Sequence, residues 1–120
     1  MVDILKDRVI SEKDAVMFDI DDTLIFINGQ ANLPIINLLK YAMNLGYKII
    51  IITARPNTMF TGMFTKWQLK KYGIPYHSLI ITPAQNKGNV KVQTGLNYIL
   101  SVGDQPTDLT HTKYAIKISI

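Results

Sequence analysis

The sequence predicts an α/β fold in which a mainly parallel, five-stranded sheet lies between two layers of helices. Two observations predict it: five short apolar segments of strand-forming residues alternate with helix-like segments, and the helix-like segments end at glycines. Parallel strands need crossover connections, which are usually helices, and such connections cover both faces of the sheet. At 120 residues the chain has the size of one domain, so we expect residues 1–120 to form a single domain.

Five segments have the composition of strands. Residues 15–20 read AVMFDI, an apolar run that meets a carboxylate, and residues 49–52 are four consecutive isoleucines. The pattern recurs in three later segments, at residues 78–82, 98–102 and 115–120. Because continuous apolar runs are typical of strands buried on both faces, these segments predict the central layer of the fold.

Three helical segments are expected between these strands. The first begins near Pro34 and ends at Gly46, and its apolar residues recur at the spacing of one helix face. The second covers about residues 58–72 and ends at Gly73, and the third covers roughly residues 86–94. We expect the second helix to bury against the sheet some of Phe60, Met63, Phe64, Trp67 and Leu69.

The composition excludes several classes of protein. With 48% hydrophobic and 18% charged residues, the chain is not a disordered tail. No apolar run approaches the roughly 18 residues that span a bilayer, so we expect a cytoplasmic protein with no membrane partner. The absence of cysteine excludes disulfides, thiolate zinc sites and a cysteine nucleophile, and two isolated histidines make a poor metal cluster. A metal site in this chain must therefore use oxygen ligands.

Beyond residue 14, the acidic residues gather in two short clusters. Asp19, Asp21 and Asp22 form one cluster, and Asp104 and Asp108 form the other. The stretch between them contains eight bases and no acid, and the net charge of the whole chain is +4. Two interpretations follow: a mildly basic, solvated surface, or an acidic metal site ringed by bases that attract a polyanion.

The first cluster, DIDDT at residues 19–23, follows directly on the first expected strand. Side chains alternate along an extended segment, so Asp19 and Asp21 face the same way, and their repulsion raises one pKa unless a cation lies between them. Carboxylates that cap a turn would explain Asp22 and Thr23, but not an aspartate that emerges from a buried strand. A hard divalent cation therefore explains the cluster better than a cap does.

The second cluster, GDQPTD at residues 103–108, follows the fourth expected strand, and Thr53 ends the second. If the fourth strand lies beside the first, Asp104 and Asp108 join the first cluster in an oxygen-rich site suited to Mg²⁺. Gly103 allows a close backbone approach at this point. Thr53 presents a hydroxyl, followed by backbone donors, to which phosphate oxygens can bind.

Together these motifs resemble those of the haloacid dehalogenase superfamily. The set is DIDDT at 19–23, Thr53 at the end of an apolar strand, a lysine near position 87 and GDQPTD at 103–108, in the family's order and at compatible spacing. The resemblance implies a Rossmann-like three-layer α/β/α sandwich and a phosphohydrolase in which Asp19 attacks phosphorus and forms an aspartyl-phosphate. It also implies that Asp21, oriented by Thr23, protonates the leaving oxygen and then activates water.

The resemblance also assigns residues to metal and phosphate. The implied Mg²⁺ ligands are Asp19, Asp21 through its backbone carbonyl, Asp104 and Asp108. The implied phosphate-binding residues are Thr53, Ala54 and a lysine. The metal would shield the nucleophile from the negative charge of the phosphate.

Two basic positions leave alternatives open. Lys87 fits the family's spacing to Asp104 better than Lys91, which lies one turn later, and the alternative for either is a surface lysine. Arg55 either clamps the substrate or pairs with a site carboxylate. We expect Lys87 to be the family's lysine.

Many members of this superfamily carry a cap domain after the first or second motif, and this chain has no room for one. Only residues 25–34 separate the first motif from the first helix, and they suit a short hairpin that turns at Asn28 and Gly29. The resemblance therefore implies a capless protein. Its open cleft suits bulky phosphate esters, unless a second subunit covers it in a homo-oligomer.

Residues 53–81 resemble the phosphatase domain of phage polynucleotide kinases. The shared features are an arginine-proline pair, a threonine and a tryptophan in the helix, and then glycine-isoleucine-proline. Thr65, Trp67 and Gly73 also have a structural explanation, which is packing of the second helix on the sheet. The same helix carries a group of lysines that either follows a phosphate backbone or forms a solvated face: Lys66, Lys70 and Lys71.

We therefore expect an enzyme, a Mg²⁺-dependent phosphomonoesterase that acts on a 3′-phosphorylated nucleic-acid end. Nucleotides and sugar phosphates are the alternative substrates. A noncatalytic module that binds phosphate or nucleic acid is the alternative from another class, and the complete set of acids argues against it. Asp22 stands where many relatives have glycine, and its added charge is expected to influence metal affinity.

Overall fold

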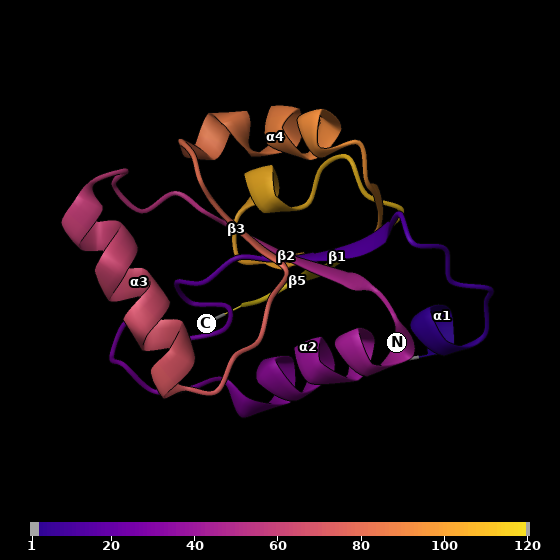
Figure 1. The fold of residues 1–120 in the computed structure, drawn as a ribbon, viewed down its shortest axis with the longest axis horizontal. Helices are drawn as coiled ribbons and strands as arrows, with labels where there is room; N and C mark the ends of the chain where they lie inside the picture. Colours follow the sequence, from indigo (N-terminus) through magenta and orange to yellow (C-terminus); the bar gives the residue numbers. More distant parts are fainter. Residues whose placement is uncertain (1–2, 120) are drawn as a thin grey trace.

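The computed structural model describes residues 3–119, whose elements follow the predicted alternation of strands and helices (Figure 1). In chain order they are α1 (Asp3–Lys6), β1 (Asp14–Phe18), α2 (Leu33–Leu45), β2 (Lys48–Thr53), α3 (Met59–Lys71), β3 (Ser78–Ile81), the 3₁₀ turn η1 (Ala84–Asn86), α4 (Lys87–Thr94), β4 (Asn97–Gly103), the 3₁₀ turn η2 (Pro106–Asp108) and β5 (Tyr114–Lys117). Among the described residues, no helix combines the length and the apolar character needed to cross a membrane.

The five strands form one sheet in the order β3-β2-β1-β4-β5, and every neighbouring pair is parallel. The predicted parallel, five-stranded sheet is therefore confirmed. At the carboxyl end of the central strand β1, Phe18 lies beside Ile51 of β2 and Val102 of β4. Because the three strands run the same way, the segments that follow β1, β2 and β4 emerge at one edge of the sheet.

Helices cover both faces of the sheet, as predicted. In Figure 1, α4 lies on one side of the sheet and α2 on the other. Alternate residues of β1 explain this arrangement, because Val16 and Phe18 pack in one core cluster with Leu39 of α2, whereas Met17 packs in the other with Val90 of α4. The central strands β2, β1 and β4 are thus buried on both faces along nearly all of their length, whereas the edge strands β3 and β5 are partly exposed. The three-layer α/β/α sandwich is confirmed.

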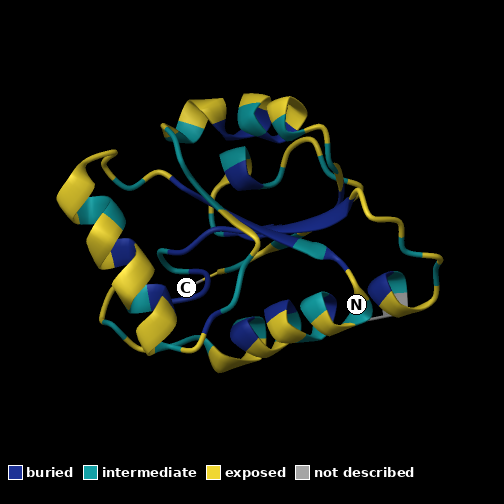
Figure 2. Cartoon of the chain, in the orientation of Figure 1, coloured by how far each residue is buried: buried dark blue, intermediate teal, exposed yellow. Residues whose placement is uncertain are grey.

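The prediction for the buried face of α3 was correct for only one residue. Of the five apolar residues expected to supply that face, only Leu69 is buried. The buried face consists instead of Thr65 and Leu69, which are one turn apart, and most of the helix surface is exposed (Figure 2). The expectation that Trp67 packs on the sheet was also wrong, because this side chain is 55% exposed. Apolar residues occur on two sides of α3, so their spacing did not identify the side that meets the core.

The segment between β1 and α2 is a short turn, as predicted, and the described residues contain no cap domain. Ile25 forms an antiparallel bridge with Ala31, and the Phe26 N–H donates to the Gln30 carbonyl at 2.8 Å. The turn closes at Gly29. Its φ of +89° is positive, and glycine adopts such values more readily than other residues do. The edge of the sheet therefore stays open above the ends of β1, β2 and β4.

Candidate active site

A cavity of about 390 Å³ lies at the carboxyl ends of β1, β2 and β4. Most of the predicted site residues line it, and they are Asp19, Asp21, Ala54, Arg55, Lys87 and Asp104. The predictions placed these residues at strand ends, and the parallel order of the strands brings those ends together. The cavity is the candidate active site.

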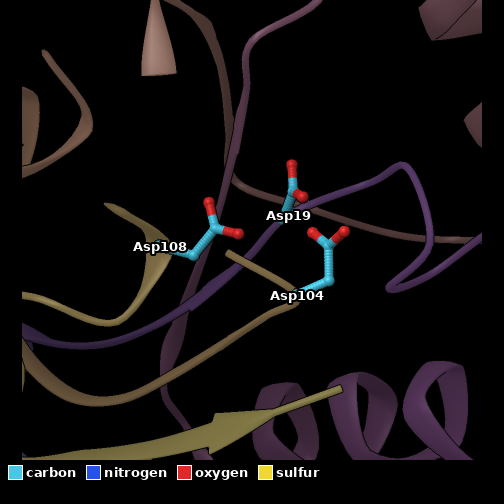
Figure 3. A group of neighbouring side chains, drawn as sticks. All are labelled: Asp19, Asp104 and Asp108. Atoms are coloured by element: carbon cyan, nitrogen blue, oxygen red, sulfur yellow. The ribbon is translucent and has the colours of Figure 1, made fainter. Parts of the chain in front are cut away.

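Three carboxylates meet beside this cavity (Figure 3). One oxygen each from Asp19, Asp104 and Asp108 lies within 4.8 Å of the others. Asp19 and Asp108 are buried and Asp104 is half-buried. The two acidic clusters of the sequence, 85 positions apart between Asp19 and Asp104, thus form one group in space because β4 lies beside β1.

The end of β4 fits closely around Asp108. An added Cβ on Gly103 would lie 2.3 Å from Asp108 Cβ and Oδ2, so a larger residue at position 103 would displace this carboxylate. The same Asp108 Oδ2 accepts a hydrogen bond from the Gln105 N–H at 3.2 Å, which holds η2 against the strand end. Gly103 provides the close approach that the sequence predicted for it.

Lys87 connects two members of the carboxylate group. Its Nζ donates to Asp19 Oδ1 at 3.0 Å and to Asp108 Oδ1 at 2.6 Å, and the lysine is 3% exposed. Burial alone would lower the pKa of Lys87, but the two facing carboxylates outweigh it and raise the pKa. Burial and the charge of Asp108 raise the pKa of Asp19 to about 7, although Lys87 opposes the shift.

Lys91 lies one turn later on α4 and points beneath the same cluster. Its Nζ donates to Ser101 Oγ at 2.9 Å and to the backbone carbonyls of Asp108 and Thr110, both at 2.7 Å. Burial, with the nearby charge of Lys87, lowers the pKa of Lys91 to about 8. Both lysines are buried, so the alternative of a surface lysine is wrong for each. Only Lys87 contacts carboxylate groups of the cluster.

Arg55 pairs with Asp21. Its Nη2 lies 2.8 Å from Asp21 Oδ1 and its Nε lies 3.0 Å from Oδ2, a two-point contact that orients both groups. Arg55 Nη1 also donates to the buried Thr65 Oγ1 at 3.0 Å, which links α3 to the site. Sequence reasoning assigned Thr65 only a packing role, and no local pattern in the sequence identifies its contact with Arg55.

The remaining predicted residues differ in what surrounds them. Thr53 is buried at the end of β2, and its Oγ1 accepts from the Arg55 N–H at 3.3 Å. Ala54 is exposed and lines the cavity. The Thr23 hydroxyl is buried and has no hydrogen-bond partner within residues 3–119. Its expected contribution to orienting Asp21 stays a prediction.

Asp22 has a local structural role. Its φ of +61° lies in the left-handed region, where glycine is favoured and aspartate is tolerated better than most residues. Its Oδ1 accepts the Ile27 N–H at 3.1 Å and so holds the turn after β1. The backbone conformation thus explains why an aspartate can replace a glycine at this position.

The donor set at this edge of the sheet fits a hard divalent cation. The carboxylates of Asp19, Asp104 and Asp108 supply the oxygen ligands that Mg²⁺ prefers. With Asp21, the group contains four carboxylates. They face two cations, the Lys87 ammonium and the Arg55 guanidinium. The site therefore keeps an excess of negative charge that a bound divalent cation would balance.

Comparison with known proteins gives a family and a fold. Residues 16–109 match the model of the haloacid dehalogenase-like hydrolases. No curated protein matches at a significant level. Among solved structures, a chain in a structure of the "Pnkp1/Rnl/Hen1 complex" is 22% identical in sequence, with a TM-score of 0.67. The match covers 88% of this chain and 46% of the chain in that complex.

A second similar structure, "the Pnkp1/Rnl/Hen1 RNA repair complex", has 20% identity and a TM-score of 0.64 over 88% of this chain and 42% of that chain. This chain thus spans less than half the length of either. At these identities the likeness concerns the fold. The family match is of a different kind, because it covers most of the sequence, including both acidic clusters.

Proposed function

The chain belongs to the haloacid dehalogenase-like hydrolases, and we propose that it is a Mg²⁺-dependent phosphomonoesterase acting through an aspartyl-phosphate on Asp19. One observation carries the proposal. A buried carboxylate, Asp19, lies at an open cavity in contact with the Lys87 ammonium and grouped with the oxygens of Asp104 and Asp108. This arrangement has a nucleophile, a cation for the phosphate and ligands for a metal within one group.

In the first step, an Asp19 carboxylate oxygen attacks the phosphorus, and the bond from phosphorus to the ester oxygen breaks. Asp21 enters this step in its protonated form and gives that proton to the leaving oxygen, so the alcohol leaves neutral. In the second step, water attacks the phosphorus of the aspartyl-phosphate, and the bond from phosphorus to the Asp19 oxygen breaks. Inorganic phosphate leaves, the Asp19 carboxylate is restored, and Asp21 is protonated again by the proton that it takes from the water. The Arg55 pair holds the Asp21 carboxylate at the cavity that the ester would enter.

The other residues bind and neutralise the phosphate. Lys87 donates to Asp19 and reaches the cavity, so it offsets charge on both the nucleophile and the incoming phosphate. Thr53 is the last residue of β2 and Ala54 follows it, so the Thr53 hydroxyl and the Ala54 backbone provide donors at the same edge. Asp19, Asp104 and Asp108 would hold Mg²⁺, with the Asp21 carbonyl as the further expected ligand. When bound, the ion supplies positive charge that stabilises the developing negative charge on the phosphate oxygens.

We propose a 3′-phosphorylated nucleic-acid end as the substrate. The cavity is open because the described chain has no cap, so a phosphate on a large molecule can reach Asp19. The stretch between the acidic clusters contains bases but no acid, which favours a polyanion. A similar fold also occurs in the Pnkp1/Rnl/Hen1 RNA repair complex.

Phosphate release from a small panel tests this proposal. The panel contains an aryl phosphate, mononucleotides and a 3′-phosphorylated oligonucleotide, each with Mg²⁺ and with EDTA. We expect release that requires Mg²⁺ and a higher kcat/KM for the oligonucleotide than for the mononucleotides. Equal or better mononucleotide rates would favour nucleotides or sugar phosphates instead. No release from any member by a folded, Mg²⁺-binding protein would favour a noncatalytic binding module.

A further inference from the structure

The outward face of α3 carries an exposed apolar stripe. Phe60, Met63, Phe64 and Trp67 are 84%, 63%, 52% and 55% exposed, respectively. Their spacing of three, four and seven residues places them on one side of the helix, opposite the buried Thr65 and Leu69. These four residues are called the α3 stripe. Exposed apolar surface of this extent is typical of an interaction site.

The charges around the α3 stripe indicate a polyanion. Lys66, Lys70 and Lys71 lie on the same helix, which contains no acidic residue. Lys71 Nζ lies 5.2 Å from the centre of the Trp67 ring, and the rings of Phe64 and Trp67 lie 5.8 Å apart at an angle of 32°. Flat aromatic faces beside cations suit a chain of bases joined by phosphates, because bases stack on aromatic rings and lysines attract the phosphates.

A groove connects the α3 stripe to the candidate active site. It has a volume of about 510 Å³ and is lined by Asp21 and Arg55 at the site, by Phe64 and Gln68 on α3, and by Phe26 and Ile27 on the turn after β1. The Tyr72 hydroxyl donates to the Gly29 carbonyl and so ties this turn to the end of α3. The groove therefore has one aromatic ring, Phe64, on the α3 side and the apolar residues Phe26 and Ile27 on the side of the turn, and it reaches Asp21 and Arg55 of the site.

We infer that the α3 stripe and this groove bind single-stranded nucleic acid and direct its terminal phosphate to Asp19. The placement of the terminal phosphate at Asp19 rests on the proposed phosphatase function. The binding of the strand to the α3 stripe can be measured separately. The terminal base lies in the groove against Phe64, and the preceding bases stack along the stripe toward Trp67. A duplex does not bind in this way, because its bases are already stacked on each other.

Trp67 reports this binding directly, since it is the one tryptophan of the chain. We titrate the protein in EDTA with single-stranded oligonucleotides that end in a 3′-phosphate or a 3′-hydroxyl, and with a duplex. Both single strands should quench the Trp67 fluorescence, more strongly than the duplex at equal concentration, and added salt should weaken the binding. If neither single strand quenches the Trp67 fluorescence, the inference is overturned.

Two substitutions separate stacking from simple apolar contact. Trp67→Phe keeps an aromatic face, whereas Trp67→Leu keeps apolar surface area but has no aromatic face. The Kd is measured by the fluorescence anisotropy of a labelled oligonucleotide. Trp67→Leu should raise this Kd about tenfold, and Trp67→Phe should raise it much less. The matched control is Tyr114→Leu, which removes an exposed aromatic ring that also lies near a lysine, Lys113, but on β5 at the other edge of the sheet. Tyr114→Leu should bind like the wild type.

The lysines are tested by salt dependence. Replacing Lys66, Lys70 and Lys71 by glutamine should lower the slope of log Kd against log salt by about 2, since each lost contact with single-stranded phosphate lowers it by about 0.7. An unchanged slope would contradict the assignment of these lysines to phosphates. Sedimentation of the wild type gives a further test. A dimer that dissociates in Trp67→Leu would identify the stripe as an interface between copies and overturn the inference.

The aryl phosphate separates this inference from the proposed function. It is too small to reach the α3 stripe, so its Mg²⁺-dependent hydrolysis reports only the chemistry at Asp19. If the aryl phosphate is hydrolysed, the ratio of kcat/KM for the oligonucleotide to that for the aryl phosphate should fall about tenfold in Trp67→Leu. If it is not hydrolysed but single strands still quench Trp67, the proposed function fails and the binding surface stands.

Discussion

The two ends of β1 each carry a buried aspartate, and the surroundings of the two carboxylates are opposite. At the amino end, Asp14 accepts hydrogen bonds from Arg8 Nη1 at 2.7 Å, the Ser11 N–H at 2.9 Å and Asn97 Nδ2 at 3.0 Å. Burial alone would raise the pKa of Asp14, but these donors outweigh it and lower the pKa to about 2. At the carboxyl end, burial and the Asp108 charge raise the pKa of Asp19 to about 7.

The difference separates a structural carboxylate from a reactive one. Both oxygens of Asp14 are occupied by donors from its own chain, so this end of the strand is closed and stable. Asp19 shares Lys87 with Asp108 and lies at a cavity, so its negative charge is only partly balanced. Like-charged groups held together at an open edge cost stability and are typical of functional sites. Asp14, at the closed end, and Asp19, in the candidate active site, are thus only five positions apart along the chain.

Asp19→Asn should reduce catalysis more than any other single substitution. Asparagine has the same shape but is a poor nucleophile, so kcat for the aryl phosphate should fall by about 10³-fold or more. Thermal unfolding should show that the variant remains folded, because the buried negative charge at this end is removed. Near-normal turnover by the purified variant would show that the proposed mechanism is wrong.

The second effect distinguishes the two buried lysines of α4. Lys87→Met removes the cation that faces Asp19, and we expect kcat/KM to fall by about 10²- to 10³-fold. Lys91→Met removes three hydrogen bonds beneath η2, and we expect it mainly to lower the free energy of unfolding, by about 1–3 kcal/mol. Steady-state kinetics and urea unfolding of both variants make the comparison. A larger kinetic loss in Lys91→Met would reverse the two assignments.

A third effect concerns the close fit at the end of β4. The added methyl group in Gly103→Ala would displace Asp108, and kcat/KM should fall by up to about a hundredfold. The matched control is Gly62→Ala in α3, where an added Cβ would meet no described atom within 4 Å. Gly62→Ala should be neutral or stabilise the helix by up to about 1 kcal/mol. Equal kinetic effects of the two substitutions would contradict the role assigned to Gly103.

At the amino end of β1 the expected effect is on stability. Asp14→Asn weakens the contact with Arg8 and the two other hydrogen bonds, so the free energy of unfolding should fall by about 1–3 kcal/mol. Urea unfolding measures this change. The kcat for the aryl phosphate, corrected for the folded fraction, should match that of the wild type, because Asp14 lies at the opposite end of the strand from Asp19. A loss of kcat would show that the two ends are coupled.

A smaller effect is the pH dependence of the difference in free energy of unfolding between the wild type and Asp14→Asn. The pKa of Asp14 is about 2 in the folded protein and near 3.8 in the unfolded chain, so its ionised form stabilises the fold above pH 3.8. This contribution is lost as the pH falls toward 2. The difference in unfolding free energy between wild type and Asp14→Asn should therefore shrink between about pH 4 and pH 2, as measured by urea unfolding. A difference that stays constant over this range would contradict the assigned pKa.

Much of the fold could be predicted from local pattern. The apolar segments that became β1 and β2 are buried on both faces, and the glycines at positions 46 and 73 lie in left-handed conformations after α2 and α3. Such features depend on a few neighbouring residues, so the sequence displays them directly. The buried face of α3 could not be predicted in this way. Leu69 and Trp67 are both apolar, and only the position of the helix at the end of the sheet decides which of them meets the core.

The residues that follow the ends of the strands could be read from the amino-acid sequence. Asp19, Thr53 and Asp104 follow apolar runs, and parallel strands bring such residues to one edge. The partners of these residues depend on the packed fold: Lys87 rather than Lys91 reaches Asp19, and Arg55 pairs with Asp21. Strand formation depends on near neighbours, whereas these contacts join residues 34 and 68 positions apart. Such contacts form only when the whole sheet and its helices are packed.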